Sequence, residues 1–250
     1  MLSSDLAVYL AFGFAAQLVD GALGMAYGLI CTSALVASGA PPMVASASVH
    51  AAEVITTGLA GGSHLWHRNV DWRLFRRLAP AGVVGGAFGA YVLTELPMGV
   101  VRPLVTVYLL GITALIAWRL FTGHPARQVR ALGVAPVGAC GGFLDAIGGG
   151  GWGSLVTSTL IARGESPRHA IGSAGLAEFL VTVAFSATFL ATLDFGTYSR
   201  VVLGLVIGGA LAAPFAGWLS RALPQRVLMG AVAVVVGGLS MHSLMRLAGG

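Results

Sequence analysis

The chain has 250 residues, of which 56% are hydrophobic and only 9% are charged, and its mean hydropathy is +0.87. Soluble domains carry about 25% charged residues, so this composition excludes an ordinary soluble domain and indicates a polytopic helical membrane protein. The formal net charge of +5 comes from 14 basic and 9 acidic residues, and every basic residue is an arginine. The arginines gather in short loops between apolar segments, which is typical of membrane orientation and argues against nucleic-acid binding.

In chain order, a long apolar segment with a glycine-containing interruption comes first, and three ordinary spans follow it. The same succession then occurs a second time. The interrupted segments lie at about 5–38 and 128–163, and the spans lie at about 43–64, 74–94, 100–119, 168–191, 198–219 and 227–246. Each span is long enough to cross about 30 Å of hydrocarbon as a helix. The predicted fold class is therefore an all-α polytopic membrane protein.

A shift of 125 residues aligns the first half of the chain with the second. Residues 13–57 align without a gap on 138–182, with 15 identities in 45 positions. After a further shift of two residues, the match resumes with 86–97 against 213–224. We therefore predict one transmembrane transporter domain over 1–250, built from two repeats of about 125 residues at 5–122 and 128–247.

Each interrupted segment either crosses the membrane once or turns back as a re-entrant hairpin, and the sequence leaves both possibilities open. With single crossings, the loops divide the arginines nine to five between the two sides, whereas with hairpins they divide them eleven to three. The positive-inside rule favours the hairpins. Hairpins also make the units inverted repeats with both termini outside, a common plan of transporters. Eight full spans in parallel repeats are the alternative.

The second interruption reads FLDAIGGGGWGS at residues 143–154. Glycine costs about 1 kcal/mol relative to alanine in a helix, so five glycines in six positions should unwind a turn. A half-helix beginning near Gly150 then presents free N–H groups to an anion. Close helix packing through small residues is the alternative. The predicted substrate-binding residues are Gly149, Gly150, Gly151, Trp152, Gly153, Thr157 and Ser158, with Gly24, Gly28, Thr32 and Ser33 in the first unit.

Four acidic residues lie within apolar segments and form two repeat-related pairs, Asp20 with Asp145 and Glu53 with Glu178. A charge that faces lipid at the bilayer centre costs about 2.5–3.5 kcal/mol on insertion scales, so these side chains should face the bundle interior. We predict that they couple transport to protons, with His50 as a further relay. The alternative is that they accept hydrogen bonds from the loosened backbone of the hairpins.

His50 and Glu53 also lie on one helix face and could supply two metal ligands, with Asp20 nearby. The second unit has Gly175 in place of the histidine, and no third certain ligand is apparent. No complete catalytic constellation is present either. We therefore predict no metal site, no cofactor and no enzymatic activity.

The whole chain, from about residue 5 to 246, resembles the TauE/SafE sulfite exporter family. The resemblance is carried by DAIGGGGWG, ARGESPRHAIGS and LAEF in the second half and by DGALGMAYG, SGAPPMVASAS, HAAE and HRNVDWRLFRRL in the first. It implies a transporter of small sulfur-containing anions, such as sulfite, sulfonates or sulfoacetate, in the bacterial inner membrane. In the first half, Met25-Ala26-Tyr27 replaces most of the glycines, so the second hairpin is expected to contact the substrate more closely.

We therefore expect a proton-coupled secondary transporter, an exporter of a small sulfur oxyanion or organosulfonate. The expected partners are this anion, protons and the lipid bilayer, and a homodimer is one assembly open to such a protein. A divalent metal cation transporter and a membrane scaffold subunit of a partner complex are the alternatives.

Overall fold

The computed structural model describes residues 2–23, 26–122, 133–194, 196, 198–222 and 224–248, and every regular element in these ranges is helical. The first half contains α1 (Leu2–Leu23), α2 (Tyr27–Ala37), α3 (Pro42–Trp66), α4 (Trp72–Glu95) and α5 (Met98–Thr122). The second half contains α6 (Val134–Gly148), the π-helical turn η1 (Trp152–Thr157), α7 (Ser158–Ala162), α8 (Pro167–Thr192), α9 (Ser199–Ala222) and α10 (Gln225–Ala248). Each of the six predicted spans coincides with one long helix, and the all-α fold class is confirmed.

Four of the long helices, searched within the described residues, are long and apolar enough to cross a membrane. They are Pro42–Trp66, Met98–Thr122, Arg168–Thr192 and Arg226–Ala248. Large apolar side chains also cover the outside of the molecule, because Val84, Phe121 and Val234 are each at least 70% exposed. Such an exterior is stable against lipid tails and would be costly against water.

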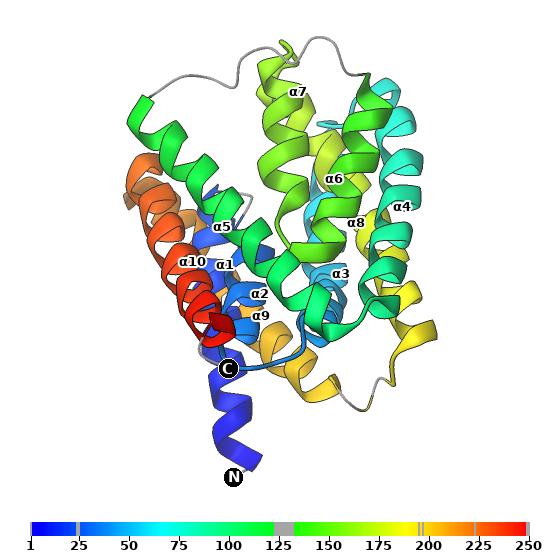
Figure 1. Ribbon diagram of the computed structural model, residues 1–250. Helices are drawn as coiled ribbons and strands as arrows, with labels where there is room; N and C mark the ends of the chain where they lie inside the picture. The colour runs from blue at the N-terminus through cyan, green and yellow to red at the C-terminus, as the bar shows by residue number, and fades with distance from the viewer. Residues whose placement is uncertain are drawn as a thin grey trace.

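Both interrupted segments contain a break, and their two parts lie side by side (Figure 1). In the second unit, Gly149 ends α6 with a left-handed backbone (φ +68°), a conformation that favours glycine. The returning chain brings Val156 against Gly141 of α6. In the first unit, the Sγ atom of Cys31 on α2 lies 3.9 Å from the carbonyl oxygen of Phe12 on α1. Each interrupted segment is therefore a helical hairpin in this structure.

The returning arm of each hairpin ends in the same way in both units. Gly39 after α2 has φ +102°, and Gly164 after α7 has φ +95°. The next N–H group in each unit donates a hydrogen bond to a carbonyl oxygen five residues earlier: Ala40 to Leu35 at 3.0 Å, and Glu165 to Leu160 at 3.2 Å. All of these positions differ by 125 residues, so the sequence repeat recurs in the details of the backbone.

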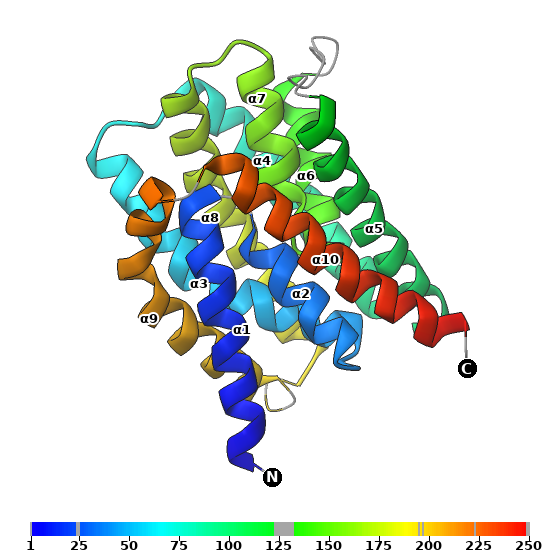
Figure 2. The same cartoon turned by 90° about the vertical axis from the view of Figure 1, so that its left-hand side faces the viewer.

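The two halves of the chain interleave through small residues. Gly13 of α1 lies against the backbone of Leu205 on α9, and Gly138 of α6 lies against the backbone of Leu78 on α4. Between them, α3 and α8 pack closely, with Gly58 against the ring of Phe179. In both views the termini lie at one end of the molecule, and the α3–α4 and α7–α8 connections lie toward the other end (Figures 1 and 2).

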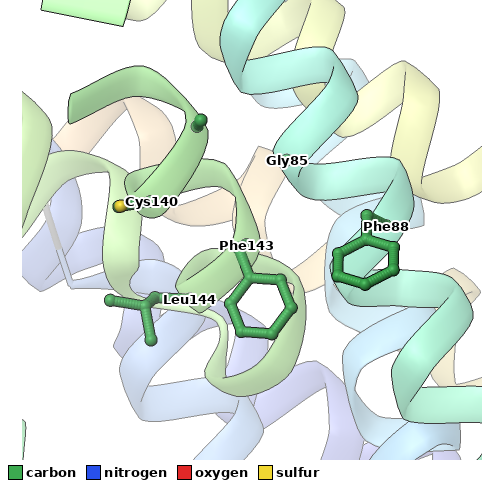
Figure 3. Close-up of a pocket in the computed structure, with 6 residues that line it drawn as sticks. Gly85, Phe88, Cys140, Phe143 and Leu144 are labelled. Carbon is green, nitrogen blue, oxygen red and sulfur yellow. The ribbon is translucent and has the colours of Figure 1, made fainter. Parts of the chain in front are cut away.

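A cavity of about 390 Å³ lies between α4 and α6. Figure 3 shows the rings of Phe88 and Phe143 beside it, with centroids 5.8 Å apart. Its lining residues are Gly85, Phe88, Ala139, Cys140, Phe143 and Leu144. A lining without charged side chains or hydroxyl groups offers nothing that would hold an anion, so the polar chemistry of the protein lies elsewhere.

Candidate functional site

Asp20 and Asp145 each accept hydrogen bonds from the start of the returning arm of their own hairpin. The Oδ1 atom of Asp20 accepts from the N–H groups of Ala26 at 2.7 Å and Tyr27 at 3.1 Å. The Oδ1 atom of Asp145 accepts from Gly151 at 2.8 Å and Trp152 at 3.2 Å. These carboxylates satisfy N–H groups that a helix start leaves without an intrahelical acceptor. Two N–H groups predicted to bind the substrate are therefore occupied by Asp145 in this structure.

The tips of the two hairpins meet backbone to backbone. A Cβ atom added to Gly28 would overlap the carbonyl oxygen of Gly149, and one added to Gly149 would overlap the Oγ1 atom of Thr32. Gly148 lies directly against the ring of Tyr108 from α5. Because any side chain at these glycines would separate the tips, the glycines allow close contact between the two units at this point.

His50 and Glu53 approach this meeting point from α3. The Nε2 atom of His50 lies 3.8 Å from Oε2 of Glu53 and 3.7 Å from Oδ2 of Asp145. On its other side, His50 Nδ1 lies 2.8 Å from the carbonyl oxygen of Ser46. A Cβ atom on Gly28 would lie 3.1 Å from Oε1 of Glu53, so this carboxyl group borders the hairpin tips.

Several buried polar atoms around the tips have no hydrogen-bond partner in the described part of the chain. Thr32 lies beside Gly149, while Tyr108 lies beside Gly148 and interacts electrostatically with Asp145. Native proteins rarely leave such atoms without a partner, so a cluster of them indicates a place for a ligand or ordered water. The cluster consists of Thr32 Oγ1, Ser33 Oγ, Tyr108 OH, His50 Nε2 and Asp145 Oδ2. We call these five atoms the central cluster.

The predicted site residues of the second unit occupy other environments. The hydroxyl of Ser158 donates to the carbonyl oxygen of Ser154 in its own helix. Trp152 is fully buried, and its Nε1 donates to the carbonyl oxygen of Ala174 at 2.9 Å. Gly150, Gly151 and Gly153 are buried around the break, whereas Thr157 is half-buried in η1. Gly24 lies outside the described residues.

The remaining acidic residue, Glu178, is half-buried on α8. It interacts electrostatically with Glu53, as do Asp20 and Asp145. The repeat-related helices α3 and α8 also meet through Thr57 and Thr182, whose hydroxyl oxygens are 3.2 Å apart. No group of three or more His, Cys, Asp or Glu side chains that could hold a metal ion occurs among the residues described.

The sequence did not single out Tyr108 or assign a role to Ser46 on its own. Tyr108 lies in the middle of an apolar span, and tyrosine in membrane helices is enriched at the two interfaces. The unusual position of Tyr108 in the middle of a span is the sequence signal that could have identified it as a site residue. Ser46 precedes His50 by one turn of α3, and its hydroxyl lies 2.5 Å from the carbonyl oxygen of Ala146 on α6.

The comparisons with known proteins give one family model and one curated relative described as a membrane transporter. The family model described as sulfite exporter TauE/SafE matches residues 9–242. A curated relative from Bacillus subtilis (strain 168), the probable membrane transporter protein YtnM, is 41% identical over 242 residues, which cover 93% of this chain and 79% of the relative. No solved structure matches the chain.

Proposed function

The chain belongs to the TauE/SafE sulfite exporter family of membrane transporters. On that premise we propose that it is a secondary transporter, which exports a small sulfur-containing anion without converting it chemically. The substrate class is sulfite, a sulfonate or a sulfoacetate-like anion. The membrane is the inner membrane of a bacterium.

The central cluster is the observation that carries this proposal. Three of its atoms are hydroxyl oxygens, of Thr32, Ser33 and Tyr108, and each hydroxyl can donate a hydrogen bond to an oxyanion. The Thr32 hydroxyl lies against Gly149 and the Tyr108 ring against Gly148, while Ser33 follows Thr32 on α2, so the glycine contact favours a compact ligand. Sulfite and sulfonate groups present three acceptor oxygens on one sulfur, which suits a set of converging donors.

Proton coupling is proposed for the acidic residues Asp20, Glu53, Asp145 and Glu178, together with His50. Every described arginine lies in a connection or within about two turns of a helix end, so none of these guanidinium groups extends from the middle of a helix. An anion that binds there must therefore be balanced by hydroxyl dipoles and by protonation of these groups. The charged form of a carboxyl group becomes less favourable when an anion binds beside it.

We further propose that the two units are inverted repeats and that the end with the α3–α4 and α7–α8 connections is cytoplasmic. These connections and the adjoining turns carry Arg68, Arg73, Arg76, Arg77, Arg163 and Arg168. The opposite end carries Arg102 at the start of α5, Arg200 at the start of α9 and Arg246 at the end of α10. This asymmetry supports the orientation through the positive-inside rule.

Counterflow in proteoliposomes tests the function. Labelled sulfite is followed against internal sulfite, methanesulfonate, sulfate or chloride, with and without a pH gradient. Saturable exchange with sulfite or a sulfonate supports the proposal, and loss of exchange in Tyr108→Phe is expected to accompany it. Thr106→Val on the same helix is the matched control, because the Thr106 hydroxyl bonds its own helix at Arg102. Silence with every anion, in folded protein, contradicts the proposal and directs the next tests to divalent metal ions and to a partner complex.

A further inference from the structure

We propose that the anion and its coupling proton occupy the site together and cross the membrane in the same direction, with His50 Nε2 as the atom that accepts the proton. This inference rests on the function proposed above and adds the coupling mode and the proton-binding atom.

The hydrogen-bond partners of His50 fix its neutral form. Its Nδ1 lies 2.8 Å from the carbonyl oxygen of Ser46, and a carbonyl oxygen can only accept, so Nδ1 carries the hydrogen. The same Nδ1 lies 3.1 Å from the Ser46 hydroxyl, which donates its own hydrogen to the carbonyl oxygen of Ala146 at 2.5 Å. The hydroxyl can therefore only accept from His50 as well. The neutral imidazole thus has a bare Nε2.

The bare Nε2 faces two carboxyl oxygens. It lies 3.7 Å from Asp145 Oδ2 and 3.8 Å from Glu53 Oε2, and neither Nε2 nor Asp145 Oδ2 has a hydrogen-bond partner. The lone pairs of Nε2 and Asp145 Oδ2 face each other without a hydrogen between them, so they repel one another. A proton on Nε2 turns this contact into an attraction between an imidazolium and the Asp145 carboxylate, with the Glu53 carboxyl group beside them. The geometry is therefore that of a proton-binding site.

The described side chains around His50 are acidic or aromatic, so a proton is the positive charge available to balance the carboxyl groups and a bound anion. Glu53 comes from α3 and Asp145 from α6, while α8 presents the rings of Phe185 and Phe189 with centroids 4.5 and 6.5 Å from the imidazole. In the next layer, Asp20 and Glu178 act on Glu53, and Tyr108 from α5 faces Asp145. No lysine exists in the chain, and the described arginines lie toward the helix ends.

An anion in the central cluster therefore binds more tightly when His50 is protonated, and by linkage the bound anion holds that proton more tightly. The two ligands favour each other's presence and travel together. A monovalent anion with one proton moves without net charge, so net flow follows the product of the anion and proton gradients. Export then occurs when the product of the anion and proton concentrations is higher on the inner side than on the outer side.

The test is entry of methanesulfonate into proteoliposomes that contain a pH-sensitive dye. This anion stays ionised at working pH, so any proton that enters with it comes through the protein. We expect the interior to acidify as methanesulfonate enters, at a rate that valinomycin with equal potassium on both sides leaves unchanged. Entry without acidification, or entry accelerated by valinomycin, overturns the inference. If sulfite exchange persists in the same vesicles, the proposed function stands, whereas absence of all exchange overturns that function itself.

Two variants locate the proton. His50→Gln should keep the protein folded and abolish acidification, with at least about a 10-fold loss of net entry, the change that 1.4 kcal/mol corresponds to. Acidification that persists in His50→Gln but disappears in Glu53→Gln overturns the assignment to His50. A monodisperse, thermally cooperative His50→Gln protein shows that the fold survives, and sulfite should protect it less against thermal unfolding than it protects the wild type, whereas equal protection would overturn the linkage between the anion and the proton.

Ser46 is assigned as the positioning residue for the imidazole. In Ser46→Ala, His50 loses one of its two acceptors, so the pH profile of entry should move to lower pH, whereas a merely structural role of Ser46 would leave that profile in place. Ser48→Ala is the control on the same helix, because its buried hydroxyl bonds only Val44 at 2.7 Å. Nitrogen-15 spectra of labelled histidines should show the Nδ1–H form for the signal that His50→Gln removes. An Nε2–H form would overturn the assignment.

Discussion

The first hairpin, α1–α2, and the second, α6–α7, share one backbone arrangement, their common frame, and differ in the hydrogen bonding of their hydroxyl groups. In both, an aspartate holds the start of the returning arm, and a left-handed glycine ends that arm. The first hairpin contributes Thr32 and Ser33, which are buried with no partner among the described residues. At the equivalent place in the second, Ser158 bonds the carbonyl oxygen of its own helix.

The difference shows how a repeated unit can form one unsymmetrical site. The elements of the frame must be duplicated because each hairpin has to satisfy its own broken backbone. The binding groups need to be present only once, at the contact between the units. His50 illustrates this, since the equivalent position in the second unit is Gly175, where an added Cβ atom would meet only the His64 ring at 3.7 Å.

The largest expected effect comes from separating the hairpin tips. In Gly28→Ala, the new methyl group overlaps the Gly149 carbonyl oxygen, which is backbone and cannot rotate away. Overpacking of this kind costs about 1–3 kcal/mol, so we expect sulfite exchange to fall at least about 10-fold. The measurement is the initial rate of counterflow.

Gly62→Ala is the control for this change, because an added Cβ atom at Gly62 on α3 meets nothing within 4 Å. Wild-type exchange in Gly28→Ala, with the protein monodisperse in detergent, would show that the contact between the tips has no part in transport.

A second comparison separates the two aspartates. In Asp145→Asn and Asp20→Asn, the remaining carbonyl oxygen can still accept from the returning arm, so both variants should fold. Only Asp145 has its second oxygen beside His50. We expect Asp145→Asn to lose transport or its pH dependence by about 10-fold or more, the size of a lost charged interaction, and Asp20→Asn to be affected less. An unchanged pH profile in Asp145→Asn would contradict the coupling role.

Much of this frame was predictable from the sequence, because it is local. Six spans and two interruptions follow from apolar run length and from glycines that unwind a turn. The interior position of the acidic residues follows from the cost of a charge in lipid. All of these arguments concern one helix and its solvent, so no tertiary information is needed.

The site could be predicted only in part, because its geometry depends on contacts between distant residues. Gly151 and Trp152 were predicted to donate to a substrate, yet their N–H groups donate to Asp145, six and seven residues away. Whether a carboxylate turns inward to its own helix or outward to a ligand depends on its rotamer, which spacing does not determine. Tyr108 enters the cluster from α5, and only the packing of α5 against Gly148 brings it there.

A third prediction compares the hydroxyl pairs. Replacing Thr32 by Val and Ser33 by Ala removes two donors of the central cluster, each worth roughly 1 kcal/mol, so the KM for sulfite should rise about 10-fold or more. The equivalent double change, Thr157→Val with Ser158→Ala, should alter KM by less than about 3-fold, since the Ser158 hydroxyl already serves its own helix. Equal effects of the two double variants would mean that both hairpins bind the anion alike.

The smallest effect should appear where the two units remain equivalent. The hydroxyl oxygens of Thr57 and Thr182 lie 3.2 Å apart, and each hydroxyl also contacts a carbonyl oxygen of its own helix, at Glu53 and Phe179 respectively. Thr57→Val and Thr182→Val should therefore lower the free energy of unfolding by about the same amount, roughly 1 kcal/mol, as measured by denaturant titration in detergent.

The double variant should cost less than the sum of the single ones, because both changes remove the same contact. Additive effects would show that the hydroxyls act separately on their own helices. The contact between the units at this level would then rest on close packing alone, through Gly58 against Phe179 and Gly61 against Leu176. The asymmetry of the molecule would in that case extend beyond the central cluster into the α3–α8 interface.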